Sequence, residues 1–318
     1  MVLDGGRDGG ADGGRVDVHQ HIAPPFWKEA AGSVDPHLAQ IADWSETNAL
    51  RSMDAIGTRF SLLSLTSPGV HFGDAKKARR LARAVNEFGA DAVRLRPDRL
   101  GLLASLPLPD VEEAVAEAEY ALDELGADGI ALLSNAGGKY LGDSSFRPLW
   151  ESLDRRAAVV LIHPTSPPGL ADLPGLAGWA EWPFDTTRTA LHLVVNGVLR
   201  AFPSIKFVLS HAGGFLPYQI TRFEELTATN PDVTREAVEE DLRRFYFDTA
   251  LSTHPATLQG LLAFTGPDHV LFGTDSPAAP LSVASSLAAQ LDAHLADIPG
   301  AAHEINIGTA QKIFGRTF

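Results

Sequence analysis

Eight short, almost wholly apolar segments recur along the chain, and each is followed by a stretch with helical spacing or helix-capping residues. The predicted strands span about 16–20, 60–65, 101–106, 129–133, 158–163, 205–210, 245–248 and 270–273. The predicted helices span 47–57, 75–94, 111–125, 146–156, 184–201, 215–227, 233–243, 254–264, 282–296 and 304–314. Strands without polar alternation are typical of a parallel sheet that is buried on both faces. Eight β-then-α units in one uninterrupted chain predict a single (β/α)8 barrel, the TIM-barrel architecture.

An open, doubly wound sheet is the alternative fold, but no glycine-rich phosphate loop follows the first strand. The length of 318 residues would suit two average domains. Barrels of about 250 residues nevertheless fold as one unit. We therefore expect one barrel domain over residues 15–318, preceded by a disordered Gly/Asp-rich arm at residues 1–14.

The composition excludes several classes of partner. There are 40 acidic and 26 basic residues, and the net charge of −14 argues against binding to nucleic acid or to an anionic membrane. The chain has no cysteine, so a metal ion must be held by His, Asp or Glu. No apolar run approaches the roughly 18 residues of a membrane-spanning helix, and the arm lacks the apolar centre of a signal peptide. We expect a cytoplasmic globular protein.

Chemically active side chains collect where the predicted strands end. His19 and His21 follow the first strand, and residues i and i+2 of a strand point the same way. The other strand-end residues of this kind are His163, His211, Asp248 and Asp275. One such histidine would be unremarkable in a core, but several strands that agree point to the active-site end of a barrel. Imidazole and carboxylate groups of this kind are accepted by zinc or manganese.

Four motifs resemble those of the amidohydrolase superfamily: His19-Gln20-His21, His163-Pro164, residues 210–214 (Ser-His-Ala-Gly-Gly) and residues 273–277 (Gly-Thr-Asp-Ser-Pro). They are most similar to its decarboxylase branch, which includes aminocarboxymuconate-semialdehyde decarboxylase and the non-oxidative aromatic acid decarboxylases. The segments 181–188 and 211–218 are similar to the 6-methylsalicylate decarboxylase group. The resemblance covers residues 15–316.

The resemblance implies one divalent metal ion held by His19, His21, His163 and Asp275, with His211 beside it. Binuclear members use a carboxylated lysine at the end of the fourth strand, whereas this strand ends in Ala-Leu-Leu-Ser and Lys139 lies further along the loop. Several decarboxylases of the branch have Glu in place of the first histidine, so two histidines favour zinc over manganese. The resemblance also implies a homodimer that acts on a small carboxylic acid.

The same residues suit two reactions. Loss of CO2 from a small hydroxylated aromatic, salicylate-type acid, or from a related unsaturated acid, needs a metal that fixes the substrate and an acid that protonates the ring carbon. We assign Asp275 as that acid and His211 as a general acid/base. In the alternative, a hydrolase of lactones or amides or a hydratase, Asp275 acts as the base for water attack.

Several further residues have both a functional and a structural interpretation. Arg222 resembles a family arginine that reaches the substrate carboxylate, and a surface ion pair is equally compatible with its position. Aromatic residues in the loops after strands one and five are candidates for lining the substrate pocket or for packing on barrel helices. They are Phe26, Trp179, Trp182 and Phe184. Asp248 is predicted to hydrogen-bond a ligand histidine or to cap its strand, and Asp185 to cap a helix.

Overall fold

The strands form a parallel barrel around a central core. The computed structural model describes residues 14–32, 44–170, 175–225 and 233–318, so the predicted arm lies outside the described residues apart from Gly14. The barrel strands are β1 (Arg15–His21), β2 (Thr58–Ser64), β3 (Leu100–Ser105), β4 (Gly129–Leu133), β7 (Val159–His163), β8 (Lys206–Leu209), β9 (Tyr246–Asp248) and β10 (Val270–Leu271). They pair in chain order as one eight-stranded sheet, and every pairing is parallel. The predicted fold class is confirmed.

The first and last strands close the barrel. The backbone amide of Val18 donates to the carbonyl of Phe272 at 3.0 Å, and that of Asp275 donates to the carbonyl of His19 at 2.8 Å. Gln20 and Ser276 form a further parallel bridge. This closure places the segment after β10 directly beside the histidines at the end of β1.

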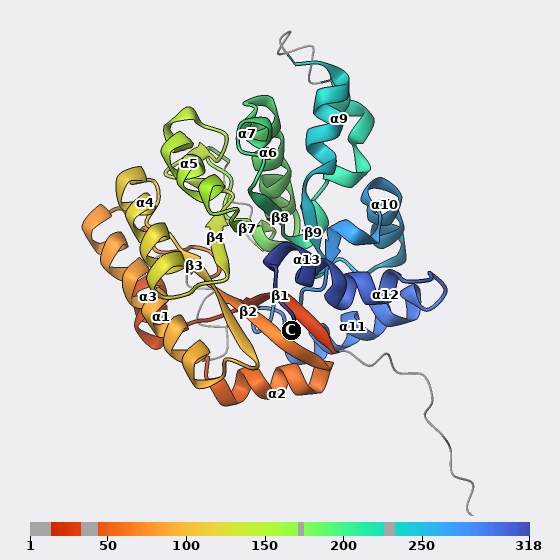
Figure 1. Cartoon of the computed structure of the whole chain (residues 1–318), viewed down its shortest axis with the longest axis horizontal. Coiled ribbons are helices and arrows are strands. Elements are labelled where there is room, and N and C mark those ends of the chain that lie inside the picture. Colours follow the sequence, from red (N-terminus) through yellow and green to blue (C-terminus); the bar gives the residue numbers. More distant parts are fainter. Residues whose placement is uncertain (1–13, 33–43, 171–174, 226–232) are drawn as a thin grey trace, which may run out of the picture.

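Helices surround the barrel on its outer side, as Figure 1 shows. They are α1 (Pro25–Gly32), α2 (Glu46–Ile56), α3 (Ala75–Leu95), α4 (Val111–Glu119), α5 (Arg147–Arg155), α6 (Trp182–Val195), α7 (Val198–Ala201), α8 (Ile220–Glu224), α9 (Arg235–Arg243), α10 (Pro255–Thr265), α11 (Leu281–Leu295), α12 (Ala301–His303) and α13 (Thr309–Phe314). None of the described helices is both long and apolar enough to cross a membrane.

The barrel interior is filled by side chains and covered at one end by the C-terminal segment. Val16, Val18 and Leu161 belong to a buried cluster that also contains Ile307 and Ile313 of the last helical segment. Helix α13 accordingly lies across the barrel in Figure 1. A packed interior of this kind leaves the other end, where the strands finish, for the functional residues.

The structure corrects several predicted boundaries. The loop after β1 contains helix α1, and the loop after β4 contains a small hairpin of β5 (Asn135–Ala136) and β6 (Lys139–Tyr140). The helix predicted at 184–201 is divided into α6 and α7, because Gly197 has a φ of +68° that a continuing helix does not allow. The predicted helix at 215–227 consists of short turns and α8, and its last residues lie outside the described part of the chain.

Candidate metal centre

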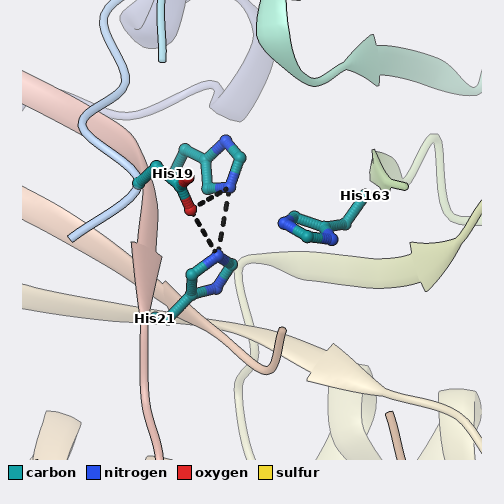
Figure 2. Close-up of side chains that lie close together, drawn as sticks. His19, His21 and His163 are labelled. Carbon is teal, nitrogen blue, oxygen red and sulfur yellow. Dashed lines mark hydrogen bonds and ion pairs between the residues drawn. The ribbon is translucent and has the colours of Figure 1, made fainter. Parts of the chain in front are cut away.

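Three histidines and one aspartate converge at the carboxyl end of the barrel. Their ligand atoms all lie within 4.8 Å of one another, and all four side chains are buried. His19 and His21 extend from β1 towards His163 at the end of β7, as Figure 2 shows. The Nε2 atoms of His19 and His21 are 3.2 Å apart, and Asp275 Oδ1 lies 2.9 Å from His21 Nε2.

In His19 and His163 the Nδ1 atom has a hydrogen-bond partner outside the cluster. The Nε2 atom of each ring therefore faces the centre of the cluster. His19 Nδ1 lies 2.7 Å from Asp248 Oδ2, and His163 Nδ1 donates to the carbonyl of Pro164 at 2.8 Å. His163 Nε2 then carries a lone pair, and it is buried without a hydrogen-bond partner among the described residues. A buried, unpartnered imidazole lone pair that faces two more imidazoles and a carboxylate fits a divalent metal ion.

The charges in the cluster support the same assignment. Burial would lower the pKa of His19, but the charge of Asp248 and the hydrogen bond to it raise this pKa to about 9. Burial lowers the pKa of His21, and it lowers that of His163 well below its ordinary value. Burial would raise the pKa of Asp275, yet hydrogen bonds from His21 and His211 lower it well below the usual range. The cluster therefore combines imidazoles that favour the neutral form, at His21 and His163, with a carboxylate that favours the ionised form, at Asp275, and such groups are ligands for a divalent cation.

His211 lies next to this cluster rather than in it. Its Nε2 is 3.5 Å from Asp275 Oδ2, at the limit of a hydrogen bond, and it has no other partner among the described residues. The backbone amide of His211 donates to Asp248 Oδ1 at 2.9 Å, so one aspartate fixes both His19 and His211. His211 and Asp275 have φ angles of +55° and +59°, which are unusual for residues with side chains. Local strain at both positions is consistent with a functional site.

Close backbone packing explains the glycines in two of the motifs. Gly214 has a φ of +67°, and a Cβ atom there would lie 2.0 Å from the carbonyl oxygen of Pro183. A Cβ atom at Gly273 would lie 3.0 Å from the Cβ of His19 and 3.2 Å from that of Asp248. Glycine at position 214 therefore lets the loop after β8 approach the start of α6, and glycine at position 273 lets the segment after β10 approach His19.

Asp17 is a supporting residue that the sequence analysis missed. Its Oδ1 accepts the backbone amides of His19 and Thr274 at 2.9 and 3.1 Å, and its Oδ2 accepts the Thr274 hydroxyl at 2.6 Å. The fully buried carboxyl thus joins β1 to the segment that carries Asp275, and burial raises its pKa to about 6. A carboxylate inside an otherwise apolar strand was the signal for this role.

The predicted substrate-binding residues occupy different places. Trp182 packs edge-on against His163 with ring centroids 5.7 Å apart, so it lies at the metal centre. Phe26 packs against Phe88 of α3, so it packs on a barrel helix, which is the second of the two interpretations of its sequence position. Trp179 is 79% exposed. Phe184 and Arg222 line a groove formed by α6 and by residues 215–223, together with Phe215, Tyr218 and Arg188.

Asp185 does not cap a helix as predicted. Helix α6 starts at Trp182, and its N-terminal flanking residue makes no side-chain cap. The buried Asp185 carboxylate instead accepts hydrogen bonds from Ser134, Asn135 and Tyr140 in the loop after β4. Lys139 in the same loop is directed towards Ser145 and Asp143 at the surface, so it is not a metal ligand in this conformation.

Comparisons with known proteins agree with this geometry. The Amidohydrolase family model matches residues 16–316. The 6-methylsalicylic acid decarboxylase of Penicillium expansum is 37% identical over 95% of this chain and 96% of its own length. The 2-amino-3-carboxymuconate-6-semialdehyde decarboxylase of Dictyostelium discoideum is 29% identical over 83% of this chain and 81% of its own.

A solved structure shares the fold over almost the whole chain. It is the dihydroxybenzoic acid decarboxylase of Polaromonas sp. JS666 with bound manganese and the inhibitor 2-nitroresorcinol. Its TM-score is 0.81 at 25% identity, and the match covers 96% of this chain and 98% of that one. The resemblance inferred from the motifs is confirmed, and the chain belongs to the amidohydrolase family, in the branch whose curated relatives are decarboxylases.

Proposed function

We propose that this protein is a metal-dependent, non-oxidative decarboxylase of a small hydroxylated aromatic acid of the salicylate type. The observation that carries the proposal is the buried His19–His21–His163–Asp275 cluster, with His211 Nε2 3.5 Å from Asp275 Oδ2. The 37% identity to a 6-methylsalicylic acid decarboxylase over nearly the whole chain supports the choice of substrate class.

The reaction replaces a carbon–carboxylate bond with a carbon–hydrogen bond. A proton is added to the ring carbon that bears the carboxylate, the bond to the carboxylate breaks, and its electron pair returns to the ring as CO2 leaves. A divalent metal held by the four ligands would bind the substrate oxygens and neutralise their charge. The protein must therefore supply one proton and hold the ring carbon close to it.

We assign proton delivery to Asp275 and His211. The low pKa of Asp275 keeps its carboxylate ionised, so it must receive a proton before it can act as an acid. His211 Nε2, 3.5 Å from Asp275 Oδ2, is in position to supply that proton. Asp248 positions His211 through the backbone amide and His19 through its ring, which links the proton donor to the metal ligands.

We also propose roles for the aromatic residues and the arginine. Trp182 provides an apolar wall beside His163, which excludes water from one side of the site. Arg222 makes no ion pair with another described residue, and we propose that its guanidinium attracts the substrate carboxylate. Phe184, which lines the same groove, and the exposed Trp179 would then flank the approach of the substrate, while Phe26 acts through its packing on α3.

We propose zinc as the resident metal, because three imidazoles and one carboxylate are a donor set that zinc favours. Manganese remains the alternative, and a dihydroxybenzoic acid decarboxylase of similar fold contains it. Following the family resemblance, we further propose that the protein is a homodimer, which sedimentation of the metal-loaded protein tests.

Metal analysis combined with product analysis tests the function. We expect roughly one metal ion per chain and release of CO2 from at least one hydroxybenzoate in a panel that includes 6-methylsalicylate. One metal ion without CO2 from any acid would favour the hydrolase or hydratase alternative. A protein that binds no divalent metal would contradict the assignment of the site.

A further inference from the structure

A second cavity lies at the same end of the barrel as the metal ligands. It has a volume of about 190 Å³ and is lined by residues at or just after the ends of four neighbouring strands, β2, β3, β4 and β7. Leu65, Leu106, Leu133 and Thr165 are one representative from each of these segments. The four metal ligands do not line it, and neither do the aromatic residues or the arginine discussed above.

The cavity adjoins the metal cluster on two sides. Leu65 directly follows Ser64, whose carbonyl oxygen lies 3.3 Å from His21 Nδ1. Thr165 follows His163 by two residues, and its hydroxyl hydrogen-bonds the hydroxyl of Ser67 at 2.8 Å. The cavity lining is therefore continuous in the chain with His163 and with Ser64, the residue that contacts His21.

The lining of the cavity is uncharged. Among the described residues that form it there is no Asp, Glu, Lys or Arg, and His71 is the one titratable side chain. Leucines, alanines and Val70 provide about half of the surface, and polar groups, among them the side chains of Ser105 and Asn135, provide the rest. An apolar protein cavity of about 150 Å³ is large enough to bind benzene. This cavity therefore suits one aromatic ring edge with a small substituent, and it offers a charged group no partner.

The outer wall of the cavity is held by the buried hydrogen-bond network around Asp185. Ser134, which donates to Asp185, also accepts the backbone amide of Thr165 at 3.1 Å. Asn135 donates both to Asp185 at 2.9 Å and to the carbonyl of Ser166 at 3.1 Å. The loops after β4 and β7, which form this wall, are thus joined through one carboxylate, and the wall has a defined position before any ligand binds.

We infer that this cavity binds the uncharged ring edge of a one-ring aromatic acid, on the side away from the carboxylate, and so sets which ring substituents are accepted. The inference rests on the proposed function. It assigns the carboxylate and the proton donors to the metal cluster, and the uncharged part of the substrate to this cavity. Leu133, which packs over Gly69, and Ala136 then control the size of the accepted substituent.

The first test measures binding of a neutral ring and does not need turnover. The probe is 3-methylphenol, added to the metal-loaded protein and followed by calorimetry. Ala136→Trp places an indole in the cavity and should weaken binding roughly tenfold or more. Ala302→Trp is the matched control, because Ala302 is also a half-buried alanine on the main core and lies outside the cavity. Metal content and melting temperature, measured for both variants, show whether the fold is retained.

A widening variant provides a second, independent readout. Leu133→Ala should raise the affinity for 3-propylphenol relative to 3-methylphenol by roughly tenfold, because two more methylene groups become buried. If the affinity ratio is the same in wild type and Leu133→Ala, and Ala136→Trp binds 3-methylphenol like the wild type, the inference is wrong. If phenol binding is unchanged in both variants but the wild type releases CO2, the cavity inference fails and the proposed function stands. Altered binding without CO2 release would support the cavity assignment and contradict the decarboxylase assignment.

Discussion

At the scale of single residues, the site depends on how each imidazole is held. His19 and His163 both use Nδ1 for a partner outside the cluster, the Asp248 carboxylate and the Pro164 carbonyl respectively. This fixes which nitrogen faces the centre and prevents ring rotation. Asp275 approaches from the segment after β10, where hydrogen bonds with the His19 carbonyl and the Ala279 amide hold its unusual backbone conformation.

Metal binding should release protons because of His19. Its pKa of about 9 means that the ring is protonated in the metal-free protein at neutral pH, whereas a metal ligand must be neutral. Between pH 7 and 9 we expect release of about one proton for each metal ion bound, with the apparent affinity rising about tenfold per pH unit. Calorimetric titration in buffers of different ionisation enthalpy measures this number, and uptake without proton release would contradict the assignment.

Asp248→Asn should weaken metal binding without abolishing it. The substitution removes the charge that holds His19, and loss of such a partner costs about 10–100-fold in metal affinity. Competition with a coloured chelator gives the affinity. Asp268→Asn serves as the control, because Asp268 also pairs with a histidine but at the surface. If both substitutions lower the metal affinity equally, the loss comes from the change in net charge and not from the contact between Asp248 and His19.

At the scale of elements, the loops after β4 and β7 depend on a helix that follows them in sequence. Asp185 lies in the first turn of α6 and accepts hydrogen bonds from three side chains of the loop after β4. Burial and the nearby Asp185 carboxylate raise the pKa of Tyr140 well above its usual value, so this phenol remains a hydrogen-bond donor. The hydrogen bonds to Asp185 thus hold the loop after β4 in one position at the carboxyl end of the barrel.

Removing the Asp185 carboxylate should destabilise the fold. Asp185→Ala leaves buried donors without an acceptor, and we expect a loss of roughly 2–4 kcal/mol in the free energy of unfolding. Urea denaturation followed by circular dichroism measures it. The exposed Asp91, which pairs with Arg94, provides the control Asp91→Ala, with an expected change within about 0.5 kcal/mol. A comparably small effect at Asp185 would show that water replaces the lost acceptor.

At the scale of the whole molecule, the metal site joins distant parts of the chain. The ligands of this site come from β1, from the end of β7 and from the segment after β10. An ion bound there would connect the first and last strands of the barrel with β7. The C-terminal helices cover the opposite end through Ile307 and Ile313. The two ends of the barrel are therefore stabilised by different means, coordination at one and apolar packing at the other.

Metal removal should accordingly lower the stability of the whole fold. A ligand at 100 times its dissociation constant adds about 2.7 kcal/mol to the free energy of unfolding. We expect the melting temperature of the chelator-treated protein to rise when zinc or manganese is restored, and to rise little in His163→Ala, which lacks one ligand. An equal rise in both proteins would show that the metal stabilises the fold at another place.

The sequence by itself determined the barrel and the metal ligands. Eight apolar runs separated by helical stretches specify parallel β/α units, and such a barrel brings the ends of all its strands to one rim. His19, His21, His163 and Asp275 could therefore be grouped without knowledge of any loop. Strand-end position is a local property, so a short apolar run that ends in a polar residue is enough to reveal it.

Only the tertiary structure decided how the loops complete the site. Asp185 supports a wall instead of capping a helix, Phe26 packs on α3, and Asp17 joins β1 to the segment after β10. The uncharged cavity beside His21 and His163 likewise arises from segments far apart in sequence. These contacts depend on the paths of irregular loops and on the packing of neighbouring helices, which residue spacing along the chain does not specify.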